Sequence, residues 1–481
     1  MTIWCLSGFV MMYMDYPRLL PAEQLQGLAP VRSLAAAELD RVALSPDLPI
    51  ASARIEMMAG RPVLRVTPAM DTGQPLEQMR VAPERFDLAT GAAFDMVSTR
   101  DLRQVADSYG GFAGVDGPLV AINPTAMDQW TVQAHRSNAP LVRADYGDPS
   151  GTQIYLSAAS GEVVQQTRFD ERFWGWLGAV PHWLYPTLLR QDGALWSQVV
   201  IWTSLTGCFL TATGLWAGLA RLRRNRDGKS GSPFGGLWWW HHIFGLWFGA
   251  MTLTWVASGL FSMNPWGFLS SDAGFAEQER LSGKANWGAF RVAVAALPDL
   301  PEDTVRIEAA RLGGTMFLAA VSRTGAITRF DRAGVRTPLD RLTLVRALTR
   351  VGRVASLDRL TAEDNYYYGH KTATKLPIWR AVLADDQQTR LYINPDTGAL
   401  VRAFDRDGRR FRWLMNGLHS LDLPVLRARP LWDLVVLSLL AMVTLVCATG
   451  TWMAFGKIRR DARRWRRRRR RPVGAVAAAG R

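Results

Sequence analysis

The chain has 481 residues, a formal net charge of +15 and 20 tryptophans, and 48% of its residues are hydrophobic. Its three cysteines, Cys5, Cys208 and Cys447, all lie in apolar segments, which excludes an external disulfide framework and an iron–sulfur motif. The sequence also lacks a phosphate-binding loop, a GxSxG elbow and a dinucleotide fingerprint. Its histidines and apolar segments are therefore the features that carry function.

A short apolar segment opens the chain. Residues 2–14 are apolar, but about a dozen helical residues reach less than about 20 Å and cannot cross a hydrocarbon core of about 30 Å. The pentapeptide Trp-Cys-Leu-Ser-Gly at 4–8 resembles Trp-Val-Ala-Ser-Gly at 255–259. We predict a partial first span over 1–16 and expect the natural protein to begin upstream of Met1 or to have lost half a span. A signal peptide is the weaker alternative, because no basic region precedes the apolar run.

Residues 17–194 and 265–430 are predicted to form two α+β domains. Short alternating segments at 152–156 and 389–393 lead into tight turns at 160–161 and 394–398, as strands do. Residues 61–66 and 309–321 have the same character, whereas 342–351 has a helical pattern.

Three stretches, 199–220, 235–264 and 434–456, carry no charged residue. At about 1.5 Å per residue, each is long enough to cross a hydrocarbon core of about 30 Å. The sequence therefore predicts membrane spans over 195–220, 235–264 and 431–456.

The positive charge is concentrated beside these spans. Residues 457–471 contain eleven basic residues against Asp461, and residues 221–229 contain five against Asp227. Lysine and arginine mark the cytoplasmic ends of spans, so the loop 221–234 and the tail 457–481 are predicted to be cytoplasmic and both α+β domains extracytoplasmic. The tail is expected to be attracted to anionic lipid. Neither cluster adjoins a nucleic-acid-binding motif, so no nucleic-acid partner is expected.

The second half of the chain repeats the first. Residues 176–182, which end at His182, return as 413–419, which end at His419. Leu-Trp at 195–196 and Thr-Gly-Leu-Trp at 213–216 return at 431–432 and 449–452. His135 and His370 likewise precede matching strand and turn patterns. We predict an internal duplication, which brings paired histidines to pseudo-symmetric positions where they can clamp a metal or haem.

Short motifs carry a family resemblance: Tyr-Ile-Asn-Pro-Asp-Thr-Gly at 392–398, His-Ser-Leu-Asp-Leu-Pro at 419–424 leading to Pro-Leu-Trp-Asp at 430–433, and Thr-Gly-Thr-Trp at 449–452. With these motifs, and with His241 four residues before Gly245, nearly the whole chain resembles the PepSY-associated transmembrane proteins. That family includes bacterial iron-regulated membrane proteins and ferric-siderophore reductases.

The resemblance implies an integral membrane helical bundle with PepSY-like extracytoplasmic domains in the bacterial inner membrane. In this chain, three full spans and one partial N-terminal span replace the four spans of the family. The reductase members hold haem by histidines in or near the spans. This sequence departs from the family at its first span, whose cytoplasmic histidine is absent.

His182 and His419 each lie just before an inward-running span, in apolar segments rich in tryptophan. Two neutral imidazoles are a suitable axial pair for a haem iron. The alternative is a pair of interfacial histidines that cap or snorkel. Because the histidine is repeated and the family implies haem, we predict that His182 and His419 bind the iron of haem b.

His241 lies inside the second predicted span, where an ionisable side chain needs a partner or a role. His242 points about 100° away around the helix, so the two histidines do not face one ion together. We predict a second haem site at His241. Its other ligand is His242 or a residue upstream of Met1; the remaining alternative is that no second haem exists.

His135 and His370 belong to the predicted external domains. The simpler interpretation is that both are surface histidines, and the functional alternative is a contact to an iron chelate or a haem propionate. Neither lies in a dense cluster with the spacing of a zinc site.

These features predict a haem-binding oxidoreductase that passes electrons from an unidentified donor across the membrane to ferric iron or a ferric siderophore. The alternative is a non-enzymatic PepSY membrane regulator or peptide-binding module, in which the histidines are structural. A transporter subunit is a weaker alternative, since no broken helix or buried carboxylate is evident in the spans.

Overall fold

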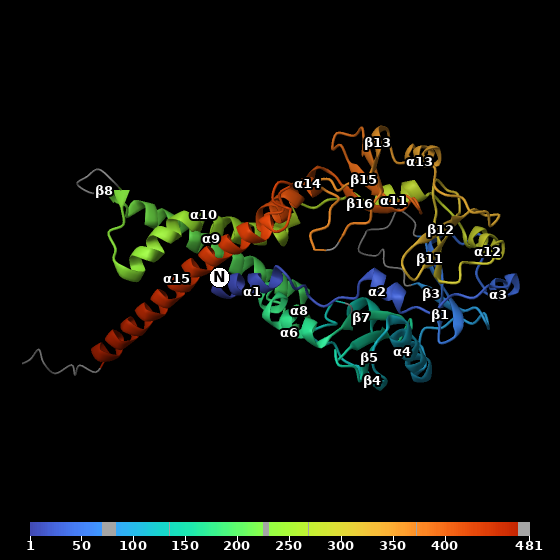
Figure 1. The fold of residues 1–481 in the computed structure, drawn as a ribbon, viewed down its shortest axis with the longest axis horizontal. Helices are drawn as coiled ribbons and strands as arrows, with labels where there is room; N and C mark the ends of the chain where they lie inside the picture. The colour runs from blue at the N-terminus through green and yellow to red at the C-terminus, as the bar shows by residue number, and fades with distance from the viewer. Residues whose placement is uncertain (70–82, 134, 225–229, 268, 372, 470–481) are drawn as a thin grey trace, which may run out of the picture.

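The computed structural model describes residues 1–69, 83–133, 135–224, 230–267, 269–371 and 373–469. The molecule is elongated, with a helical bundle at one end and β-sheets at the other (Figure 1). Within the described residues, three helices are long and apolar enough to cross a membrane: α9 (Gly193–Ala220), α10 (Gly236–Ser262) and α15 (Leu431–Arg469). The chain is therefore membrane-associated.

The bundle consists of these helices and the short helix α1 (Thr2–Met11). α1 runs antiparallel to α15, because Thr2 contacts Thr451 and Cys5 contacts Cys447. α15 continues past the predicted end of its span at 456 into the basic tail, since arginine is a good helix former. A two-stranded hairpin of β8 (Arg223–Arg224) and β9 (Ser230–Gly231) lies between α9 and α10.

Short helices connect the sheets to the spans. α6 (Phe169–Leu177), α7 (Ala179–His182) and α8 (Thr187–Arg190) precede α9. α14 (Arg406–Arg412) and the π-helical turn η3 (Trp413–Gly417) precede α15, and the 3₁₀ turn η2 (Pro265–Gly267) follows α10.

A six-stranded antiparallel sheet combines strands from both halves of the chain, in the order β12-β11-β10-β1-β2-β3. Its strands are β1 (Ile50–Met58), β2 (Arg61–Pro68), β3 (Glu84–Asp87), β10 (Thr304–Ala309), β11 (Leu318–Ser322) and β12 (Ile327–Phe330). β1 and β10 meet at the centre, where Ile55 lies opposite Ile307.

Two four-stranded antiparallel sheets have the same simple strand order. One contains β4 (Leu119–Thr125), β5 (Leu141–Tyr146), β6 (Gln153–Ser157) and β7 (Val163–Thr167). The other contains β13 (Val354–Leu360), β14 (Ile378–Leu383), β15 (Arg390–Ile393) and β16 (Leu400–Phe404). β6 and β15 form where the sequence predicts strands. Asn394 begins the turn after β15 by accepting hydrogen bonds from the amides of Asp396 and Thr397.

Helices pack in the sheet region: α2 (Pro21–Gln26), α3 (Ala36–Asp40), α4 (Thr99–Ala113), α11 (Phe275–Ser282), α12 (Trp287–Ala295) and α13 (Arg341–Leu348). The single-turn helix α5 (His135–Asn138) precedes β5. One face of the six-stranded sheet packs Ile55 and Ile307 against Trp287 and Phe290 of α12. Successive side chains of a strand point to opposite faces of the sheet. Side chains on the opposite face therefore join two further hydrophobic cores, one with α4 and one with α13.

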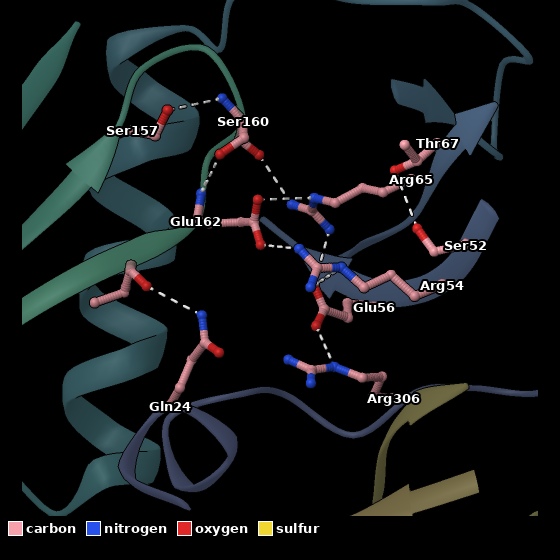
Figure 2. A network of polar contacts seen from close by, with 11 residues as sticks. Gln24, Ser52, Arg54, Glu56, Arg65, Thr67, Ser157, Ser160, Glu162 and Arg306 are labelled. Atoms are coloured by element: carbon pink, nitrogen blue, oxygen red, sulfur yellow. Dashed lines mark hydrogen bonds and ion pairs between the residues drawn. The ribbon is translucent and has the colours of Figure 1, made fainter. Parts of the chain in front are cut away.

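Buried charges cross the seam between β1 and β10. The Glu56 carboxylate lies 2.9 Å from Arg65 and 2.6 Å from Arg306, and Glu56 is 3% exposed. Arg54 bridges Glu56 and Glu162, as Figure 2 shows. Burial alone raises the pKa of Glu56, but the three nearby guanidinium groups outweigh it and lower the pKa to about 2. The network therefore joins strands from both halves of the chain.

We expect Glu56→Gln to destabilise the sheet region by about 3–5 kcal/mol, because Arg65 and Arg306 lose a buried counter-charge. Denaturant titration of the detergent-purified protein measures the change. The pKa of Glu56 is lower in the folded state than in the unfolded state. Its contribution to the free energy of unfolding is therefore present above the unfolded pKa of about 4.3 and is lost as the pH falls towards 2. The exposed Glu302→Gln is the control, with an expected change within about 0.5 kcal/mol. Equal changes in the free energy of unfolding for the two substitutions would contradict a stabilising role of the Glu56 ion pairs.

Candidate functional site

The His182 ring is held by α1. Its Nδ1 lies 3.1 Å from the Trp4 carbonyl oxygen and 3.1 Å from the Ser7 Oγ. The Ser7 hydroxyl itself donates to the Trp4 carbonyl at 3.0 Å. Gly178, between α6 and α7, allows this approach, because a side chain there would meet Val10 of α1 at 2.8 Å.

The His419 ring makes the same contacts with α10. Its Nδ1 lies 3.2 Å from the Trp255 carbonyl oxygen and 3.1 Å from the Ser258 Oγ. The Ser258 hydroxyl donates to the Trp255 carbonyl at 3.0 Å. Both histidines therefore rest on a Trp-x-x-Ser turn of a neighbouring helix.

These contacts determine the tautomer of each imidazole. A carbonyl oxygen only accepts hydrogen bonds, so Nδ1 carries the proton in His182 and in His419. In the neutral ring, the lone pair is then on Nε2. Histidines that bind a metal usually donate the other ring N–H to a carbonyl or carboxylate in this way.

The two rings lie next to each other. Their centres are 6.1 Å apart and their planes are inclined by 70°. A metal about 2.0–2.1 Å from one nitrogen of each ring, with the two nitrogens on opposite sides of it, would separate the ring centres by about 6.4 Å, which is close to the observed separation. Gly8 and Gly259 lie beside the rings, since a side chain at these positions would come within 3.9 Å of His182 and 3.6 Å of His419.

The loops that follow the two histidines also correspond. Leu184 and Leu421 both have a φ of 50°, a left-handed conformation that is strained for leucine. The Trp196 indole donates to the Trp183 carbonyl at 3.0 Å. The Trp432 indole donates to the Ser420 carbonyl at 2.9 Å. Each loop is thus tied to the helix that begins after it, which positions its histidine.

Loss of surrounding water favours the neutral form of both rings. This burial and, to a smaller extent, the neighbouring His419 together lower the pKa of His182 to about 4, although the hydrogen bond to the Trp4 carbonyl opposes the shift. The pKa of His419 is also lowered by burial, although its hydrogen bond to the Trp255 carbonyl opposes the shift. Both imidazoles are therefore neutral at pH 7, which is the form that binds a metal.

His241 lies at the other end of the bundle. Its Nδ1 is 3.0 Å from the Thr449 Oγ1, whose own proton is donated to the Leu445 carbonyl on α15. The Nδ1 of His241 is therefore the donor to Thr449, and its Nε2 is left with a lone pair. The ring lies on Gly450, where a side chain would meet it at 3.0 Å.

A cavity of about 560 Å³ adjoins His241. It is lined by parts of α9, α10 and α15, with glycines at 214, 218, 245, 249 and 450. Its volume is within the range of about 300–1,000 Å³ that is typical of ligand and cofactor pockets.

His242 also lines this cavity, but both of its ring nitrogens are engaged. Nδ1 lies 2.9 Å from the Ser232 Oγ, and Nε2 lies 2.9 Å from the Gly218 carbonyl oxygen. Binding a metal would break one of these bonds. The arrangement favours His241 over His242 as a ligand.

The remaining histidines are separate from the pair. His370 stacks edge-on against Trp432 with ring centres 4.8 Å apart, and its Nδ1 is 4.0 Å from Asp422. Its side chain is 29% exposed. His135 is the first residue of α5, and its side chain lies outside the described part of the structure. Within the described residues, no three His, Cys, Asp or Glu side chains gather as a metal cluster.

Sequence reasoning missed Ser7, Ser258 and Thr449, which orient the histidines. A sequence feature that includes the two serines was present, because Trp-x-x-Ser-Gly recurs at 4–8 and 255–259. That recurrence indicates matching spans, but it does not show which side chain the serines face.

Comparison with known proteins adds no family assignment. A scan against models of protein families gave no match to this chain, and a search of curated proteins gave none.

We expect acid to destabilise the protein through His182. Between pH 6.5 and about 4, an unfolded histidine binds a proton that the folded one excludes, so stability falls as the pH falls through this window. His182→Gln removes the titrating group. The loss of thermal stability between pH 7.5 and pH 5 should therefore be smaller in the variant than in the parent protein. Equal losses would contradict a neutral His182 in the folded state.

Proposed function

We propose that this chain is a haem-binding oxidoreductase of a bacterial inner membrane, akin to the PepSY-associated transmembrane proteins. It would carry electrons across the bilayer to ferric iron or a ferric siderophore. The observation that carries the proposal is the His182–His419 pair, in which both Nδ1 protons are anchored and the ring centres lie 6.1 Å apart.

The residues around the pair have distinct tasks in this proposal. Haem b held there would supply a one-electron Fe(III)/Fe(II) couple. His182 and His419 would hold the haem iron through Nε2, while the Trp4 and Trp255 carbonyls would fix the ring orientation and increase the basicity of the imidazoles. The apolar cluster of Met12, Trp432, Val436 and Leu440 would exclude water.

The corresponding contacts in the two halves support a duplicated architecture. Each half supplies a histidine, a Trp-x-x-Ser turn and a tryptophan that ties the histidine loop to the next helix. Each copy would therefore contribute one histidine to the pair.

His241 and its cavity would form the second redox site. His241 precedes Ser258 by 17 residues on α10, which is about 26 Å along the helix. One haem cannot span that distance, so transfer across the bundle would need a group at each end. The donor would be a membrane quinol or a cytoplasmic protein that reaches the cavity.

The basic clusters suggest the orientation. They follow the end of α9, precede the start of α10 and follow the apolar part of α15, and His241 lies in the second turn of α10. That end of the bundle would therefore be cytoplasmic and the sheets periplasmic. His182 and His419 would then lie at the periplasmic surface, where reduction to Fe(II) weakens binding by hard oxygen chelators. His370 and His135 stay candidates for contact with the chelate or a propionate.

The first test is a dithionite-reduced minus oxidised absorbance spectrum of the detergent-purified protein. We expect a b-type haem signal that falls by about one haem per chain in the His182→Ala, His419→Ala double variant, with the haem at His241 retained. Glu302→Gln is the control and should keep the signal, because Glu302 is exposed and belongs to neither histidine site. His182→Met should retain haem with a shifted spectrum, since Met and His can serve together as axial ligands.

A haem-free protein in every form would refute the proposed function and leave the sheets as binding modules. If haem binds, the reduced protein should be reoxidised on rapid mixing with Fe(III) citrate. Failure of that reaction would refute ferric reduction.

The second site predicts unequal effects of adjacent histidines. His241→Ala should reduce the haem content by about one group per chain, because the Nε2 of His241 is free to ligate. His242→Ala should leave haem content unchanged while lowering stability, because it removes two hydrogen bonds. Pyridine haemochrome assays and thermal unfolding measure the two quantities. The opposite pattern would assign the ligand to His242.

A further inference from the structure

Two cysteines meet where α1 packs on α15. The Cys5 Sγ lies 3.9 Å from the Cys447 Sγ, and both side chains are partly buried. The contact is flanked by Thr2 with Thr451, whose hydroxyl oxygens are 2.9 Å apart, and by Gly8, which faces Leu440. Cys208, the third cysteine, lies on α9.

We propose that Cys5 and Cys447 form a redox-active thiol pair that closes to an intramembrane disulfide. This inference stands on the helix contact and does not depend on haem. An S–S bond is about 2.05 Å long, so the sulfurs must approach by roughly 2 Å from their present separation. Thr2 and Gly8 contact α15 on either side of the pair, which keeps the two helices close there.

The reaction needs a two-electron acceptor. Oxidation breaks both S–H bonds and forms one S–S bond, which releases two electrons and two protons. A quinone accepts these to become a quinol, and quinones are the oxidants that drive disulfide formation at bacterial membranes. Cys447 lines the cavity beside His241, which gives such a molecule a route to the pair.

The position of the pair gives the disulfide a structural effect. Gly8 faces Leu440 on α15. Cys447 follows Leu440 by seven residues, which is about 10 Å along the helix. Cys5 lies in α1 between Trp4 and Ser7, the two residues that hold His182. Closing the bond fixes α1 on α15, and with it the orientation of the His182 ring.

Counting free thiols tests the proposal. The full-length protein in nanodiscs is incubated with a short-chain ubiquinone, then denatured and labelled with a maleimide that adds mass at each free thiol. We expect three labels before oxidation and one after it, on Cys208. Peptide mapping without reductant should show a fragment that joins Cys5 to Cys447.

Single substitutions supply the matched controls. Cys208→Ser should fall from two labels to none, whereas Cys5→Ser should keep two labels under both conditions. Oxidation should also raise the thermal unfolding midpoint of the parent protein but not that of Cys5→Ser, because only the parent closes the loop. Three labels after quinone treatment of the parent protein, or a crosslink that involves Cys208, would overturn the proposal.

Discussion

The hydrogen bond from each imidazole to a tryptophan carbonyl of a neighbouring helix is the contact on which the bundle's candidate site depends. It fixes which ring nitrogen is protonated, and it holds His182 to α1 and His419 to α10. A helix carbonyl has a second lone pair after its backbone bond, so it accepts this donor without unwinding the helix. Two ordinary helical turns thereby orient two histidines from different parts of the chain.

The second constraint acts in the sheets. Because β1 pairs with β10, the two halves share one hydrophobic core around Ile55 and Ile307 and cannot move as independent domains. The ion pairs of Glu56 with Arg65 and Arg306 reinforce this seam, since separating the strands would expose or orphan buried charges. The shared sheet therefore joins the two halves of the chain at the end of the molecule away from the bundle (Figure 1).

The spans were predictable because lipid imposes a length and a lack of charge that a sequence displays directly, and α9, α10 and α15 lie where the charge-free runs do. The strand and turn around Asn394 were predictable from local chemistry. The join between β1 and β10 was not, because it pairs residues far apart in sequence. In retrospect Arg-Ile-Glu occurs at 54–56 and again at 306–308, and the two copies pair with each other. Ser7 and Thr449 were missed because a sequence does not show which ring a hydroxyl faces.

The central position of β1 has a consequence for biosynthesis. Arg54 pairs with Glu308, so about 250 residues must be made before β1 finds its partner. At about 5–20 residues per second, β1 presents an unpaired edge for roughly 12–50 seconds. An exposed edge strand invites pairing with other chains. Ser52, Arg54 and Glu56 along β1 are polar, which makes that edge a poor template for aggregation while the rest of the protein emerges.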